Sequence, residues 1–156
     1  MKNNNLILFS FLMLSLNAQT NYKTFIENID SKSSKYSEIA QTIWNYAEMG
    51  YQEKQSSALL QKTLSDAGFR VEKGVAGIPT AFSATFGTNG PVIAILGEYD
   101  ALPGLSQKNV PYKISNNTRA GHGCGHHLFG TASAAAAIAI KNYLEETGKP
   151  GTVKFF

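Results

Sequence analysis

The spacing of apolar residues along the chain predicts three helices. Apolar positions three or four residues apart indicate helices over residues 35–49, 53–67 and 128–144. Gly50 and Gly68 follow directly after the first two segments and are typical residues for the end of a helix. The third segment is rich in alanine, so a sheet or another helix can approach its backbone closely.

Four other segments have the pattern of β-strands. Apolar and polar residues alternate over 69–72 and 80–86, as in half-buried strands, and the continuous apolar run over 92–96 is typical of a strand covered on both faces. Thr88-Asn89-Gly90 resembles a hairpin turn, and a last strand begins at Thr152. This order of elements predicts an α/β domain with a mixed sheet and helices on both of its sides.

Composition narrows the class of protein. Of the 156 residues, 43% are hydrophobic and 16% are charged, which is typical of a globular domain. The net charge is only +3 and the lysines are scattered, so the sequence gives no electrostatic footprint for nucleic acid. After the first twenty residues no segment is long and apolar enough to span a membrane. We therefore expect neither nucleic acid nor a membrane as a partner.

The first residues have the pattern of an export signal. Lys2 gives a positive start, residues 6–16 are mostly apolar, and Ala18 is a small residue suited to cleavage. The apolar run is too short to cross a bilayer of roughly 30 Å. We interpret residues 1–18 as a signal peptide and expect a periplasmic or extracellular protein; a buried amino-terminal helix is the alternative.

Potential metal ligands are concentrated in one short segment. All three histidines and the only cysteine lie between His122 and His127, separated by glycines. Thiolate and imidazole are common zinc ligands. In an extended segment Cys124 and His126 would point the same way and could reach one ion, while His127 would point elsewhere and the role of His122 stays open. The alternatives are a turn with incidental histidines or a cysteine nucleophile with a histidine base.

Two carboxylates follow the apolar run over 92–96. Glu98 and Asp100 are two positions apart and begin a long segment, 97–120, that we expect to be a loop. Sites of open α/β sheets form beyond the carboxyl ends of strands. These acids could bind a metal ion or orient a histidine that binds one; a solvated acidic loop is the alternative.

These segments together resemble a known family. The segment from Gly97 to Gln107 and the segment from Gly121 to His126 resemble motifs of the di-metal amidohydrolases and metallopeptidases that include aminoacylases and carboxypeptidase G-type enzymes. The similarity is strongest to aminobenzoyl-glutamate hydrolases. Residues 44–51 and 77–82 are also similar to that family, so the resemblance extends over nearly all of residues 19–156.

The resemblance implies a fold and a metal site. It implies a zinc-peptidase-like α/β/α sandwich with a mixed sheet, incomplete in this chain, and two divalent metal ions, zinc or manganese. By motif position Cys124 and His126 would bind metal, and Asp100 would support a ligand without binding the ion itself. The family has asparagine or aspartate where this chain has His127, and the role of Glu98 varies among relatives.

The resemblance also implies an activity. Members hydrolyse amide bonds of small molecules such as N-acyl amino acids, aminobenzoyl-glutamate or dipeptide-like substrates, through a metal-activated water. Residues 19–156 would be the amino-terminal part of the catalytic domain, without the glutamate pair and the dimerisation domain, so we expect this part alone to be inactive and the full-length protein to be a homodimer. The alternative is an exported, non-enzymatic metal-binding or scaffold module.

Overall fold

The computed structural model describes residues 23–156, in two units. The first unit, Met1–Ser33, is described from residue 23 onward and is helical over 23–30. The second unit, Ser34–Phe156, contains the sheet and the residues of the candidate site. The predicted signal peptide over 1–18 lies outside the described residues. Among the described helices, none has the length and apolar character needed to cross a bilayer.

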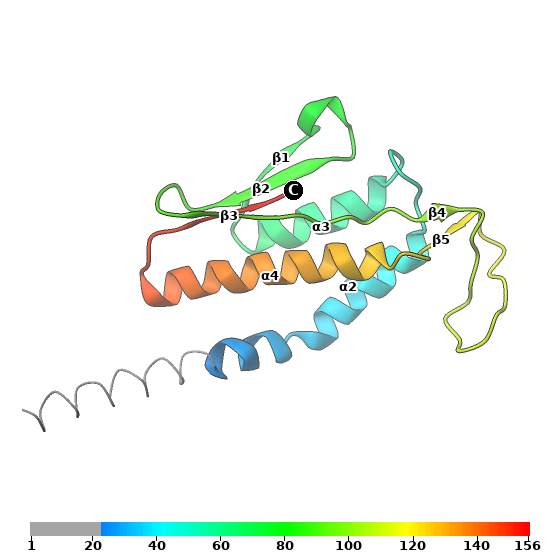
Figure 1. Cartoon of the computed structure of the whole chain (residues 1–156), viewed down its shortest axis with the longest axis horizontal. Coiled ribbons are helices and arrows are strands. Elements are labelled where there is room, and N and C mark those ends of the chain that lie inside the picture. Colours follow the sequence, from blue (N-terminus) through cyan, green and yellow to red (C-terminus); the bar gives the residue numbers. More distant parts are fainter. Residues whose placement is uncertain (1–22) are drawn as a thin grey trace, which may run out of the picture. The chain divides into compact units, whose positions relative to one another are not determined.

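The predicted elements form, with shifted boundaries. In chain order they are α2 (Ser33–Tyr46), α3 (Lys54–Asp66), β1 (Arg70–Lys73), the 3-10 turn η1 (Val75–Gly77), β2 (Phe82–Phe86), β3 (Val92–Ile95), β4 (Leu102–Pro103), β5 (Ala120–Gly121), α4 (His126–Thr147) and β6 (Thr152–Phe155) (Figure 1). The expected loop over 97–120 contains the short pair β4–β5, which encloses a loop over 104–119.

The sheet has the strand order β1-β2-β6-β3. The β1–β2 and β2–β6 pairs are antiparallel, and the β6–β3 pair is parallel. The α/β class with a mixed sheet is therefore confirmed. The hairpin suggested by Thr88-Asn89-Gly90 does not form, because β6 lies between β2 and β3 and pairs with both.

The helices pack against one face of the sheet. Strand pairing places Val71, Ala84, Phe155 and Ile95 on the same face, and Figure 1 shows α3 and α4 on one side of the sheet. The core on this face joins side chains of the sheet to side chains of the three helices, among them Ile39, Ile43, Leu60, Leu64, Ala134, Ala137, Ile138 and Phe155. Alanines on α4 allow the close approach that the sequence predicted.

The other face of the sheet is open along β3. The side chains of Val92 and Leu96 are 63% and 59% exposed. The expectation that this strand is covered on both faces is therefore not met within residues 34–156. Apolar periodicity records that a strand can be buried, but it does not say which segment covers it.

Candidate metal centre

One histidine and two carboxylates meet at the carboxyl end of β3. Nδ1 of His126 lies 2.7 Å from Oδ1 of Asp100, and Nε2 of the same ring lies 2.9 Å from Oε2 of Glu98. One ligand atom from each residue lies within 4.8 Å of the other two. The sequence predicted that these acids and His126 belong to one site, and the structure brings them together from distant parts of the chain.

Backbone contacts bring the two halves of this group together. Glu98 and Asp100 leave the end of β3, and His126 is the first residue of α4. Gly130 of α4 packs directly against the strand end, because a Cβ atom at this position would lie 2.6 Å from the Glu98 carbonyl oxygen. After Asp100, the Ala101 N–H donates to the Glu48 carbonyl oxygen at 2.7 Å, which ties the acidic segment to the end of α2.

The chemistry of this donor set suits a divalent ion. Imidazole and carboxylate are ordinary ligands of zinc and manganese. The Asp100 carboxylate accepts a hydrogen bond from Nδ1–H of His126, which fixes the ring and directs Nε2 toward Glu98. The positive end of the α4 dipole at His126 also favours the two negative side chains.

Cys124 does not belong to this group of three. Its side chain is exposed, and the metal-binding geometry found among the described residues consists of Glu98, Asp100 and His126. The expectation that Cys124 and His126 point the same way assumed an extended backbone. Gly125 instead has φ of +78° and turns the chain into α4. Metal binding by Cys124 therefore stays a prediction.

His122 and His127 lie in an aromatic cluster with Trp44, next to the group of three. The Trp44 ring centroid is 6.1 Å from that of His122 and 5.0 Å from that of His127. His122 is buried, and its Nε2 lies 3.1 Å from the carbonyl oxygen of Ile43, so Nε2–H donates to the last turns of α2. The hydrogen bond makes His122 a tie between α2 and the segment that leads to His126.

Burial suppresses the charge of both clustered histidines. It lowers the pKa of His122, and burial together with the neighbouring His122 lowers the pKa of His127 to about 4. The Nδ1 atoms of both rings are buried without a hydrogen-bond partner among the described residues. Sequence analysis left the roles of both residues open; a buried tryptophan partner could not be read from their spacing.

Glu48 was also missed by the sequence analysis. Its carboxylate accepts hydrogen bonds from the backbone N–H groups of Gln55 and Ser56 at 2.8–3.0 Å. These two groups lie in the first turn of α3, where backbone N–H groups have no partner within the helix. The available signal was an acid shortly before the start of a predicted helix.

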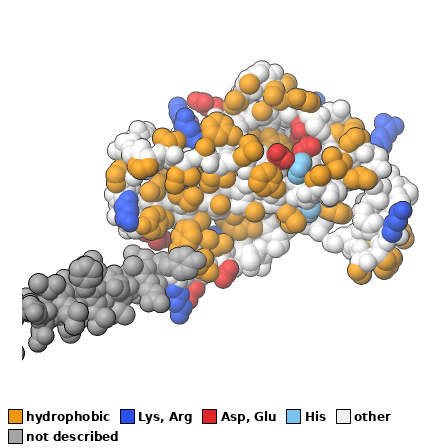
Figure 2. Space-filling view, in the orientation of Figure 1, with side chains coloured by type: hydrophobic (Ala, Val, Ile, Leu, Met, Phe, Trp, Pro, Cys, Tyr) orange, Lys and Arg blue, Asp and Glu red, His pale blue; other side chains and the backbone are white. Residues whose placement is uncertain are grey.

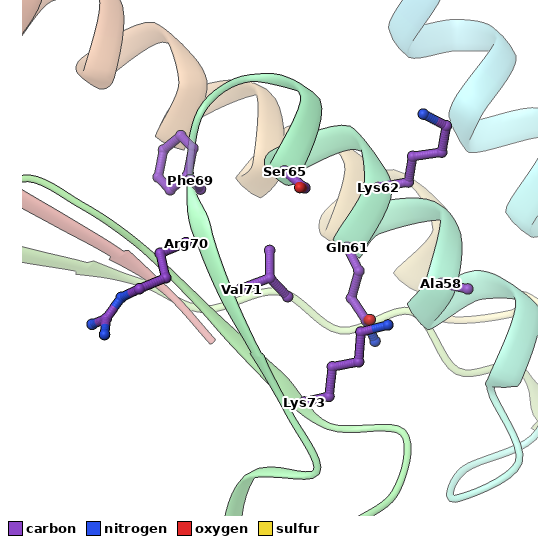
Figure 3. Close-up of a pocket in the computed structure, with 8 residues that line it drawn as sticks. All are labelled: Ala58, Gln61, Lys62, Ser65, Phe69, Arg70, Val71 and Lys73. Atoms are coloured by element: carbon purple, nitrogen blue, oxygen red, sulfur yellow. The ribbon is translucent and has the colours of Figure 1, made fainter.

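Two hollows of the surface differ in charge. Figure 2 shows acidic side chains beside a histidine at the margin of a hollow, and Glu98 and Asp100 line this hollow of about 250 Å³. A second hollow, of about 480 Å³, opens between α3 and β1 (Figure 3). Its lining includes Lys62, Arg70 and Lys73 but neither an acid nor a histidine, so it does not have the ligands of a metal site.

Comparison with known proteins supports the resemblance. No family model matches the chain. The chain is 46% identical over 138 residues to one of the subunits of the p-aminobenzoyl-glutamate hydrolase of Escherichia coli (strain K12), and the alignment covers 86% of this chain. It spans only 28% of the length of that relative.

Two solved structures share the fold. One is an aminohydrolase from methicillin-resistant Staphylococcus aureus, with a TM-score of 0.71 and 22% identity over 85% of this chain and 33% of the other. The other is a dinuclear metal-binding peptidase of the M20 family from Bacillus subtilis, with a TM-score of 0.67 and 23% identity over 81% of this chain and 35% of the other. The chain is thus a homologue, over part of their length, of the aminobenzoyl-glutamate hydrolases, M20-family peptidases and aminohydrolases.

Proposed function

We propose that the full-length protein is a metal-dependent hydrolase of amide bonds in small substrates. N-acyl amino acids, aminobenzoyl-glutamate and dipeptide-like amides are the substrate classes that the homologues suggest. The observation that carries the proposal is the convergence of Glu98, Asp100 and His126 at the carboxyl end of a strand.

The residues of this chain would hold and orient one metal ion. His126 would bind through Nε2, because Nδ1 is engaged by Asp100, and Glu98 would supply a carboxylate oxygen. Asp100 keeps the imidazole in one tautomer and one orientation. A bound divalent ion would supply an activated water and polarise the amide carbonyl. Cys124 is a further candidate ligand, and we propose two ions in the full-length protein, zinc or manganese.

Hydrolysis of an amide by the complete reading frame tests this function. The purified protein should cleave aminobenzoyl-glutamate or a small dipeptide when zinc or manganese is supplied, and a chelator should abolish the cleavage. If none of these amides is hydrolysed in a chelator-sensitive way, the proposal fails. Stoichiometric metal binding without hydrolysis would instead favour a metal-binding module.

We also propose that residues 19–156 alone are inactive. The described residues bring together one imidazole and two carboxylates, whereas a two-metal hydrolytic centre needs a larger ligand set. The measurement is the same amide assay on residues 19–156 and on the complete protein, at equal metal concentration. Equal rates would contradict the proposal.

Export and dimer formation remain proposals of the sequence. Cleavage after Ala18 should give a mature protein that begins near Gln19, which amino-terminal sequencing of the native protein can check. A native start at Met1 would exclude export by this signal. Light scattering of the full-length protein should give the mass of a homodimer, and a monomer mass would exclude it.

A further inference from the structure

The hollow beside Glu98 and Asp100 has apolar walls. Its lining includes Phe82, which is buried, and Tyr99, whose ring stacks on Phe82 with centroids 6.1 Å apart. Tyr51 also lines the hollow, with its side chain 75% exposed. The volume of about 250 Å³ is sufficient for one substituted aromatic ring.

A buried carboxylate also lines this hollow. Glu53 is only 8% exposed, and its Oε2 accepts a hydrogen bond from the Thr80 hydroxyl at 2.7 Å. The Thr80 carbonyl oxygen is itself occupied, because it accepts from Ser57 Oγ at 2.6 Å and from the Tyr99 hydroxyl at 2.7 Å. This network fixes the position of the Glu53 carboxylate.

The second oxygen of Glu53 is free to accept. The hydrogen bonds of residues 23–156 give Oε1 no partner, and the lining of the hollow contains no lysine, arginine or histidine. A carboxylate this deeply buried is costly unless its hydrogen-bonding capacity is met. The hollow therefore combines apolar walls with one fixed, unfilled acceptor, next to the acids of the candidate metal centre.

We propose that this hollow is a substrate subsite for a flat apolar group that carries an N–H donor, such as an arylamine, and that Glu53 Oε1 accepts from that donor. The inference rests on the proposed function, whose scissile amide would lie at Glu98, Asp100 and His126. An anionic group is disfavoured in the hollow, because three carboxylates and no cation line it. A site that is built to hydrogen-bond a substrate group discriminates strongly against the analogue that lacks this group.

The experiment compares two substrates that differ only in the donor. With the complete metal-loaded protein, kcat/KM is measured for p-aminobenzoyl-glutamate and for benzoyl-glutamate, in the unaltered protein and in Glu53→Gln. We expect the substitution to lower kcat/KM for the amino substrate about tenfold, mainly through KM, and to change the value for benzoyl-glutamate less than twofold. Glu72→Gln, an exposed acid of β1 outside the hollow, is the matched control and should leave both values unchanged.

Direct binding separates this inference from the proposed function. Calorimetry should show that 4-aminobenzamide binds the unaltered protein more tightly than benzamide does, and that Glu53→Gln removes this preference. If neither glutamate conjugate is cleaved, the proposed function fails and this binding difference alone decides the subsite. Equal losses for both substrates, or equal binding of both amides, would overturn the subsite. If Glu53→Gln does not fold, Glu53→Asp, which withdraws the acceptor by one methylene, should show the same loss of preference.

Discussion

At the scale of single residues, the hydrogen bond between Asp100 and His126 decides how the imidazole is presented. Asp100→Ala removes the acceptor of Nδ1–H, so the ring loses its fixed tautomer and orientation. We expect metal affinity to fall roughly 10–100-fold. Competition with a chelating dye measures the affinity, and Asp66→Ala on the exposed face of α3 is a control that should not change it.

Cys124 and Glu98 make opposite predictions about the ligand set. If Cys124 binds metal, as its motif implies, Cys124→Ser in the full-length protein should lower metal content and hydrolysis together. If the ion is held by Glu98, Asp100 and His126, Glu98→Gln should have the larger effect. Metal content by mass spectrometry and amide hydrolysis are measured for both variants. A Cys124→Ser protein with full metal content and full activity would exclude Cys124 as a ligand.

His122 should act by holding α2 to the segment that leads to the site. His122→Leu removes the hydrogen bond to the Ile43 carbonyl oxygen and should lower the free energy of unfolding by about 1–2 kcal/mol. His122→Gln can still donate from its side-chain amide and should recover most of this loss. Denaturant unfolding of both variants measures the difference. Equal stability of the two variants would show that this hydrogen bond contributes little.

At the scale of elements, the contact between α4 and the end of β3 fixes the distance between His126 and the acids. Gly130→Ala would place a methyl group 2.6 Å from the Glu98 carbonyl oxygen, so the strand end has to move away from the helix. Although alanine favours helices, we expect a net destabilisation of about 1–3 kcal/mol and weaker metal binding. Thermal unfolding and metal titration check both effects, and Ala132→Gly, at an exposed position of α4, shows the cost of helix propensity alone.

Local patterns were sufficient for the helices but not for strand order. The apolar spacing of α2, α3 and α4 is set by the 3.6-residue period and could be read directly. The turn over 88–90 specifies a change of direction and not a partner, so the sequence could not show that β6 separates β2 from β3. The pairing is decided by long-range burial of Val153 and Phe155, which are fully buried in the centre of the sheet.

The candidate site could be predicted to a similar extent. Strand topology accounts for the meeting of Glu98, Asp100 and His126, because the acids follow a buried strand and the histidine begins the next helix. The orientation of Cys124 depended on which of three nearby glycines adopts a left-handed conformation, and the sequence does not distinguish them. The packing of His127 on Trp44 is a tertiary contact with no local signal.

At the scale of the whole molecule, the suppressed charge of the histidine pair makes stability depend on pH. The pKa of His127 is about 4 in the folded chain, below its value of about 6.5 in an unfolded chain. The unfolded state therefore binds the proton first as the pH falls. For metal-free protein, the contribution of His127 is complete above about pH 6.5 and is lost progressively toward pH 4, with a total of roughly 1–3 kcal/mol. His122 acts in the same direction.

Chemical unfolding of metal-free protein at pH 7 and at pH 4.5 measures this dependence. The free energy of unfolding should be lower at pH 4.5. His127→Phe removes the titrating group while keeping an aromatic ring against Trp44, so it should reduce the difference between the two pH values. An unchanged difference in this variant would assign the pH dependence to other groups.

The position of β6 has a consequence for the order in which the protein can assemble. Translation delivers β2 and β3 before α4, and β6 only after it, although β6 is the strand that both of them pair with. A nascent chain that has not yet released Thr152–Phe155 from the ribosome holds two strands with no common neighbour and a helix whose apolar side lacks its sheet. The sheet therefore closes in one late step, and the growing chain depends on protection from aggregation until that step is complete.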